Sequence, residues 1–353
     1  MTALLANTLA AIPPLDASLI AEATERQNQL TKIPGSLGLL EEVSIQLAGI
    51  SGQCPPPIPQ QAVIGVFGGD HGICAQGVTP WPQEVTVQML ANMAHGGAAI
   101  NALARQVGAR VMITDVGVAT DYEPHEAVRT RTVRRGTADF SVGAAMSREE
   151  AVAALEVGIE AGLEAIDAGA DCLLTGDMGI GNTTPSAALI SVFSGQPVVS
   201  VTGPGAGADN AMLAHKTQVL EQALAMHSPD PSDPVGVLAA VGGLEQAAIA
   251  GFILAAASRR VPVILDGVIA CSAACVAVAL APEAKGYLIS GHAGLEPGIT
   301  AALAHLDLRP LVDLGLRLGE GTGAALALPL VQCSARVLAE MATFADAGIA
   351  AGQ

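Results

Sequence analysis

Short apolar runs alternate along the chain with longer Ala-rich stretches, and this alternation limits the possible folds more than any other feature. The runs are AVIGVF (62–67), ARVMITDVGV (109–118), DCLLTG (171–176), PVVSVTG (197–203), VPVILDG (261–267) and GYLISGH (286–292). Most are apolar throughout, which is typical of strands buried on both faces. Strands separated by helices form parallel sheets with a helical layer on each side. The sequence therefore predicts an α/β fold.

Most of these runs lead into turns that contain glycine. In parallel sheets, ligands bind beyond the carboxyl ends of the strands, where such turns lie. Residues before CPPPIP (54–59) and after Glu320 look mainly helical. Ser147 and Glu150 form a capping box that predicts a helix start.

Composition excludes several classes of partner. The 353-residue chain has a formal net charge of −17, whereas nucleic acids and anionic membranes attract basic surfaces. An anionic small ligand would need a local positive site.

No membrane span is predicted, although 51% of the residues are hydrophobic. The uncharged stretch between Asp266 and Glu283 is shorter than the ~20 residues that a spanning helix needs. A second uncharged region, 178–208, is interrupted by Gly and Pro turns. The first residues lack the basic stretch of a secretory signal, so a cytoplasmic location is expected.

The loop GDMGIGNTTP (176–185) predicts an anion site. Its glycines leave backbone amides open, Thr184 suits a helix N-cap, and Pro185 suits the first helical position. A helix N-terminus of this kind favours a phosphate. The alternative is an ordinary strand-to-helix turn.

Glu320 stands among glycines in RLGEGTGAALALP (317–329). Glycines allow tight turns and close approach to a ligand, so this carboxylate is a candidate functional group. The alternative is a solvated charge at a helix start, which is also favourable.

No metal and no cofactor are predicted. The pair Asp70–His71 supplies too few ligands for a catalytic metal, and the six cysteines form no CxxC motif. The GxGxxA pattern in TGPGAGA (202–208) lacks the acidic residue that a dinucleotide site needs about 20 residues further on. Trp81, between Pro80 and Pro82, could cover a flat heterocycle or pack in the core.

These motifs together resemble one family, the nicotinate-nucleotide:dimethylbenzimidazole phosphoribosyltransferases. The resemblance covers nearly the whole chain and includes PGSLGLLE, DHGICAQGVTPWPQEVTVQML, GGAAIN, GDMGIGNTTP, VGGLEQAAIAG, ILDG and RLGEGTGAALALP. It implies a Rossmann-like parallel sheet covered by helices in a large domain (60–320), a small helical domain built from both chain ends (1–59 and 321–353), and a homodimer.

The resemblance also implies the reaction, a pentosyl transfer from nicotinate mononucleotide to 5,6-dimethylbenzimidazole. The products would be alpha-ribazole 5'-phosphate and nicotinate, as in assembly of the cobalamin nucleotide loop. It makes Glu320 the catalytic general base. The implied phosphate and ribose contacts are Gly176, Asp177, Gly179, Gly181, Asn182, Thr183, Thr184, Lys216 and Asp266, and the implied base contacts are Trp81, Gln88, Leu318 and Gly319.

The chain departs from the family pattern in places. Asp177 stands where the family commonly has Glu, and Ile33 and Leu39 replace a Pro and an Arg. A relative acting on another lower-ligand base, a nucleotide-binding regulatory protein and a Rossmann oxidoreductase remain alternatives.

Overall fold

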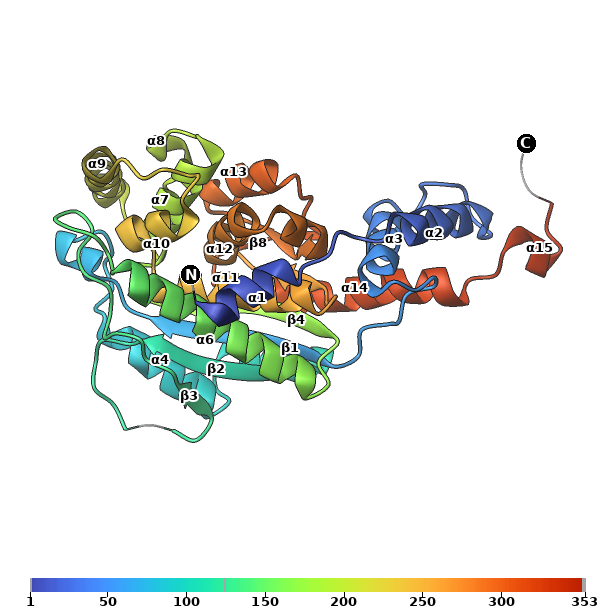
Figure 1. Cartoon of the computed structure of the whole chain (residues 1–353), viewed down its shortest axis with the longest axis horizontal. Helices are drawn as coiled ribbons and strands as arrows, with labels where there is room; N and C mark the ends of the chain where they lie inside the picture. The colour runs from blue at the N-terminus through green and yellow to red at the C-terminus, as the bar shows by residue number, and fades with distance from the viewer. Residues whose placement is uncertain (1, 124, 351–353) are drawn as a thin grey trace.

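The computed structural model describes residues 2–123 and 125–350, and its centre is a six-stranded sheet (Figure 1). All neighbouring strands are parallel, in the order β3-β2-β1-β4-β5-β6. Their bounds are β1 (Ala62–Gly69), β2 (Arg110–Gly117), β3 (Val128–Thr130), β4 (Cys172–Met178), β5 (Val263–Leu265) and β6 (Leu288–Ser290). This order confirms the Rossmann-like α/β fold. The chain reverses direction across the sheet between β1 and β4, where such sheets bind ligands.

One predicted strand is wrong. PVVSVTG contains a single helical turn, α8 (Val198–Val201), instead of a strand. Val198 and Val201 are buried while Val199 is 66% exposed. The apolar contacts therefore follow the spacing of a helical turn, and this segment lies outside the sheet. A small parallel pair, β7 (His292–Gly294) and β8 (Val312–Leu316), was not predicted.

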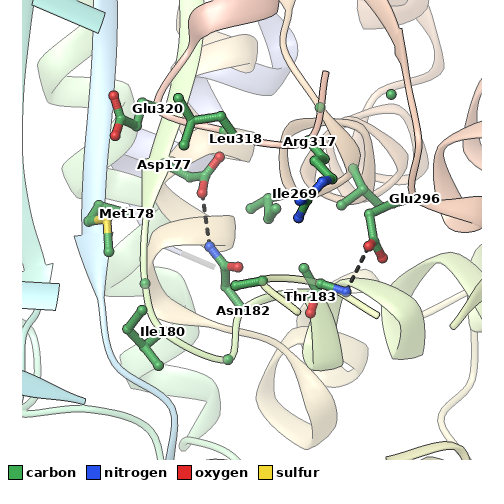
Figure 2. A pocket seen from close by; sticks show the side chains of 18 of the residues that line it. Asp177, Met178, Ile180, Asn182, Thr183, Ile269, Glu296, Arg317, Leu318 and Glu320 are labelled. Atoms are coloured by element: carbon green, nitrogen blue, oxygen red, sulfur yellow. Dashed lines mark hydrogen bonds between the residues drawn. The ribbon is translucent and has the colours of Figure 1, made fainter. Parts of the chain in front are cut away.

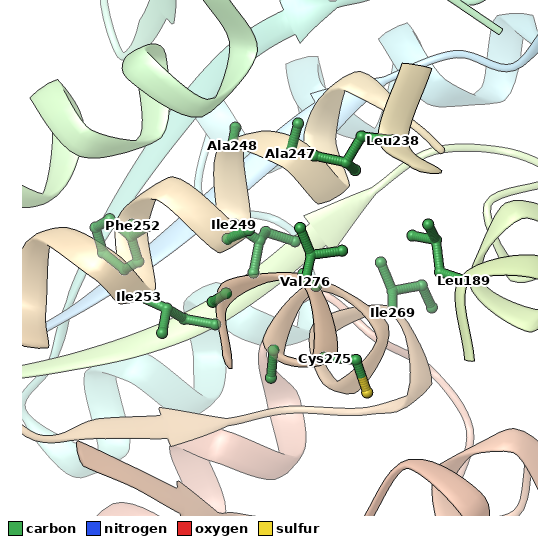
Figure 3. Close-up of a cluster of buried hydrophobic side chains, with 14 of the residues drawn as sticks. Leu189, Leu238, Ala247, Ala248, Ile249, Phe252, Ile253, Ile269, Cys275 and Val276 are labelled. Atoms are coloured by element: carbon green, nitrogen blue, oxygen red, sulfur yellow. The ribbon is translucent and has the colours of Figure 1, made fainter. Parts of the chain in front are cut away.

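Helices cover both faces of the sheet. One face carries α6 (Arg148–Asp167), α11 (Leu244–Ser258) and α12 (Val268–Leu280), with α7 (Thr183–Ser194), α10 (Pro234–Val241) and α13 (Pro297–Leu306) packed beyond them. Figure 3 shows the apolar side chains of α11 and α12 in this layer. The other face carries α4 (Glu84–Ala94), α5 (Ala99–Val107) and α14 (Thr322–Glu340). The predicted capping box at Ser147 and Glu150 starts α6.

Both ends of the chain contribute to a helical unit beside the sheet. Helices α2 (Ala17–Gln29) and α3 (Leu39–Ser51) pack on α14, which extends past the end of the sheet toward them (Figure 1). Helix α1 (Ala3–Ala10) instead contacts α6 and α11, and α15 (Phe344–Ala347) ends the described helices. The boundaries of the two expected domains stay a prediction. They assign α14 to the small domain, although this helix also packs on β4 and β5 of the sheet.

Among the described residues, α14 alone is long and apolar enough to cross a membrane by length and composition. Of its most apolar window, 56% is buried inside the fold. It packs on α3, α5 and strands of the sheet, as a core helix does.

The remaining helices connect these layers. They are α9 (Asn210–His227) and two short 3-10 segments, η1 (Gly72–Gln76) and η2 (Pro282–Tyr287).

Candidate active site

A cavity of about 490 Å³ lies at the carboxyl ends of the central strands. Its volume falls in the usual range for a small-molecule site. The lining segments follow β1 (78–81), β4 (178–183), β5 (267–269), β6 (292–296) and β8 (316–320), joined by part of α4 and the loop 204–206. The site therefore forms where the sheet topology predicts it.

Glu320 enters the cavity from a left-handed stretch of backbone. Gly319, Glu320 and Gly321 have φ angles of 84°, 64° and 94°. A non-glycine residue seldom adopts this conformation, and such strain gathers at functional sites. A Cβ at position 321 would lie 3.0 Å from the carbonyl oxygen of Thr175, so the flanking glycine is sterically required.

Asp266 holds the backbone of residues 319–324 in place through hydrogen bonds to its amides. Its carboxylate accepts hydrogen bonds from the amides of Gly321 (3.2 Å), Gly323 (2.7 Å) and Ala324 (3.2 Å), at the start of α14. The residue is fully buried and does not line the cavity. In this structure Asp266 acts on the position of Glu320, and its predicted contact with phosphate or ribose stays untested.

The Glu320 side chain is only 4% exposed, so the interpretation as a solvated helix-start charge is wrong. Burial raises the pKa of this carboxyl, the backbone N–H of Ile100 lowers it, and the Asp266 charge raises it further; the net direction is upward. Ile100 donates to Oε2 over 3.1 Å, from the first turn of α5. A carboxylate with a raised pKa is suited to accept a proton near neutral pH.

Asp177 is a second buried carboxylate in the same cavity (Figure 2). Its Oδ2 accepts a hydrogen bond from Nδ2 of Asn182 over 2.9 Å. Oδ1 has no hydrogen-bond partner among the described residues. Burial first, and the Asp266 charge second, hold the pKa of Asp177 well above its usual value.

The start of α7 differs from the prediction. Asn182, not Thr184, occupies the N-cap position, and Pro185 is the third helical residue rather than the first. Gly181, with φ 86°, makes the turn, so the helix begins immediately after it. Thr184 is buried, and its hydroxyl has no partner among the described residues.

Lys216 lies behind this helix start and does not line the cavity. Its Nζ donates to Oγ1 of Thr183 (2.7 Å) and to the carbonyl oxygen of Gly203 (3.1 Å). Burial lowers the pKa of Lys216 to about 8, although the Glu296 charge opposes the shift. Lys216 is thus joined to the cavity through Thr183, which lines it, and its predicted contact with the phosphate stays a prediction.

The structure brings most of the predicted site residues to one cavity. Those on its surface are Trp81, Asp177, Gly179, Gly181, Asn182, Thr183, Leu318, Gly319 and Glu320, whereas Gly176, Thr184, Lys216, Asp266 and Gln88 are not. Gly176 lies in β4 against the Glu320 backbone. Gln88 is exposed and is not among the lining residues, whereas Val85 and Met89 of the same helix line the cavity.

Several lining residues were not predicted. Arg317 is exposed and carries the one Lys or Arg side chain among the lining residues, and Figure 2 shows its head group directed into the cavity. Glu296 accepts a hydrogen bond from the Gly205 amide over 2.7 Å. Arg317 could have been found, since it begins the RLGEG motif. No local pattern marks Glu296.

Trp81 stands at the rim of the cavity and is 50% exposed. Its indole N–H donates to the carbonyl oxygen of Ala206 over 2.9 Å. Of the two alternatives for Trp81, core packing is wrong. With Met89, Ile269 and Leu318, it makes the lining mostly apolar.

Comparisons with known proteins find similar proteins of one family over nearly the whole chain. A family model described as phosphoribosyltransferase matches residues 12–349. The nicotinate-nucleotide–dimethylbenzimidazole phosphoribosyltransferase of Salinispora tropica is 57% identical over 98% of this chain and 99% of its own, and that of a Roseiflexus species is 53% identical over 98% of each. The crystal structure of CobT from Thermus thermophilus is 45% identical and superposes with a TM-score of 0.91, covering 95% of this chain and all of that one.

Proposed function

Because this chain belongs to the family of nicotinate-nucleotide–dimethylbenzimidazole phosphoribosyltransferases, we propose that it transfers phosphoribose from nicotinate mononucleotide to 5,6-dimethylbenzimidazole. The products are nicotinate and alpha-ribazole 5'-phosphate. One observation carries the proposal: a buried carboxylate, Glu320, in a mostly apolar cavity whose opposite side offers Arg317 and the start of α7.

The chemistry needs one proton acceptor. The bare nitrogen of the benzimidazole attacks C1' of the ribose, and the bond from C1' to the pyridinium nitrogen breaks with its electron pair going to nicotinate. The leaving group loses its positive charge in this step, so it needs little acid assistance. The benzimidazole must shed the proton from its other nitrogen, and Glu320 takes it.

The raised pKa of Glu320 serves this role. Burial makes the carboxylate a stronger base than one in water, since its charged form is less well solvated. The Ile100 amide occupies Oε2, so in the described structure Oε1 is the oxygen to meet the benzimidazole N–H.

Nicotinate mononucleotide carries two anionic groups, a phosphate and a carboxylate, on a protein of net negative charge. The start of α7 at Thr183 provides amides and the positive end of a helix dipole, which suit the phosphate. Arg317 provides a guanidinium for the remaining carboxylate. The flat heterocycle of the acceptor fits the apolar part of the cavity near Trp81 and Met89.

The test is to incubate the purified protein with nicotinate mononucleotide and dimethylbenzimidazole and to separate the products by chromatography. Formation of alpha-ribazole 5'-phosphate with release of nicotinate supports the proposal. Turnover with adenine or a phenol, and none with dimethylbenzimidazole, would identify a relative acting on another base. Binding of the nucleotide without any turnover would indicate a regulatory protein. A Rossmann oxidoreductase would instead bind a nicotinamide dinucleotide.

We further expect a homodimer in the cytoplasm. Large apolar side chains are exposed outside the cavity lining, among them Ile33 (77%) and Leu314 (61%), and a second copy could cover such residues. Light scattering during size-exclusion chromatography tests the assembly, since a monomer mass would contradict it.

A further inference from the structure

A buried cluster of ionisable side chains lies against the 176–185 loop, on the side of the loop that faces away from the cavity. It consists of Asp70 and His71, which follow β1, and Glu245 in the first turn of α11. All three side chains are fully or almost fully buried. Nε2 of His71 lies 3.0 Å from Oε1 of Glu245, which is salt-bridge distance, although the two groups are not aligned as a hydrogen bond.

The cluster touches the loop where the loop has no side chain. A Cβ at position 179 would lie 3.2 Å from Nε2 of His71 and 2.3 Å from the carbonyl oxygen of Gly69. Gly179 lines the cavity on its other side. A single layer of backbone thus separates the imidazole from the cavity.

The same turn of α11 supports the next part of the loop. Nε2 of Gln246 donates to Oγ of Ser186 (2.7 Å) and, at 3.4 Å, to the carbonyl oxygen of Asn182. The motif VGGLEQ, which no step of the reaction uses, therefore connects the start of α11 to the loop at two points.

The charges of the cluster indicate that His71 supports the loop and does not attract the phosphate itself. Burial by itself would lower the pKa of His71, but the facing Glu245 and Asp70 carboxylates outweigh it, and the net shift is upward. One imidazolium between two carboxylates gives no net positive charge with which to attract a phosphate. Among the described residues no set of three His, Cys, Asp or Glu side chains is spaced to hold a metal ion.

We propose that His71 is a positioning residue. Paired with Glu245, it supports the Gly179–Asn182 turn on the side away from the cavity. This support holds the turn's amides and the side chains of Asn182 and Thr183 in the positions that the phosphoribosyl substrate needs. This inference rests on the proposed function. If His71 supports only the loop that binds the nucleotide, its replacement should weaken binding of nicotinate mononucleotide far more than binding of dimethylbenzimidazole.

The experiment compares His71→Leu, His71→Gln, Glu245→Gln and a matched control, Asp115→Asn. Asp115 is equally buried and lies in β2, the strand beside β1, but its carboxylate accepts hydrogen bonds from Val118, Tyr122 and Thr132, which are not part of the loop. We expect His71→Leu to raise KM for nicotinate mononucleotide about tenfold, equivalent to about 1.4 kcal/mol, with KM for dimethylbenzimidazole changed less than about twofold. His71→Gln keeps an N–H near the position of Nε2 and should recover most of the loss.

Asp115→Asn should lower the melting temperature and leave both KM values unchanged. An unchanged KM for nicotinate mononucleotide in His71→Leu, or an equal rise in the control, would overturn the inference. If His71→Leu does not fold, Glu245→Gln decides in the same way. Wild-type protein that binds the nucleotide without turnover contradicts only the proposed function, and the Kd of the nucleotide across the same variants then decides about His71.

Discussion

Glu320 combines three properties that seldom occur together in one residue: a left-handed backbone, nearly complete burial and a raised pKa. Each costs folding free energy, and proteins retain such costs at functional sites. Asp266 offsets part of the cost by bonding to three amides beside Glu320. These properties suit the proton acceptor that the proposed reaction needs.

Glu320→Gln tests the base directly. Glutamine keeps the size of the side chain and can accept the Ile100 hydrogen bond, but it cannot take up a proton. We expect turnover at saturating substrate to fall by roughly 10²–10⁴, with the melting temperature and nucleotide binding little changed. Steady-state kinetics beside thermal unfolding provides the measurement, and near-wild-type turnover would disprove the assignment.

Asp177 should reduce stability at neutral pH. Its pKa in the folded protein is raised above the ordinary 3.8, so its contribution to stability is fully present below that value and is lost as pH rises through the folded pKa. Asp177→Asn removes the ionisation and keeps an oxygen that can accept the Asn182 hydrogen bond. The variant should therefore melt at a higher temperature than the wild type, by more at about pH 8 than at about pH 5.

Thermal unfolding at both pH values, without substrate, checks this prediction. Asp115→Asn serves as the control, since its carboxylate accepts three hydrogen bonds and its loss should lower the melting temperature at both pH values. If Asp177→Asn raises the melting temperature by the same amount at both pH values, the electrostatic explanation is contradicted.

At the scale of elements, α6 and α11 approach each other unusually closely. A Cβ at Gly158 would lie 1.8 Å from the carbonyl oxygen of Ala248, and one at Gly251 would lie 1.9 Å from that of Leu155. Both neighbours are backbone atoms, which cannot turn aside as a side chain can. The crossing places α11, and with it Glu245, against the ends of β1 and β4.

Gly158→Ala should destabilise the protein although alanine is the better helix former. The clash with Ala248 should cost about 1–3 kcal/mol or more, which outweighs the gain in helix propensity of roughly 0.5–1 kcal/mol. Denaturant unfolding measures the difference. Gly143→Ala is the matched control, because nothing lies within 4 Å of its Cβ position, and it should stay within about 0.5 kcal/mol of wild type.

At the scale of the whole molecule, the two ends of the chain are joined through α14. Arg26 on α2 donates from Nε to the carbonyl oxygen of Leu338 (2.7 Å) and from Nη2 to that of Ala339 (3.3 Å). These carbonyls belong to the last turn of α14, where helical hydrogen bonds end. The opposite end of the same helix starts beside Glu320.

Arg26→Ala should loosen the helical unit without affecting catalysis. The loss of charged hydrogen bonds should cost roughly 1.5–3 kcal/mol, and hydrogen exchange should rise first in α2 and α3. Turnover should persist, since Asp266 anchors the start of α14 independently. Arg336→Ala, which breaks an exposed pair with Glu340 on the same helix, should change stability by less than about 0.5 kcal/mol. Loss of turnover in Arg26→Ala would show that the two ends of α14 are coupled.

The sequence by itself determined the layered α/β fold and five of the six central strands, and it singled out Glu320, whose catalytic role stays a prediction. These features depend on local chemistry: strands buried on both faces must be apolar throughout, and an acid in a tight turn needs flanking glycines. PVVSVTG was predicted wrongly because a short β-branched run can also bury its apolar side chains as one helical turn, and only its place outside the sheet decides.

Only the tertiary structure decided which predicted residues reach the cavity. Asp266 bonds to amides of α14, Lys216 bonds to Thr183, and Gln88 is not part of the lining. Arg317 and Glu296, which were not predicted, do line the cavity. Each of these outcomes depends on the distance between groups that lie far apart along the chain. These distances are set by the strand order and by how closely the helices pack on the sheet, so a local sequence pattern cannot predict them.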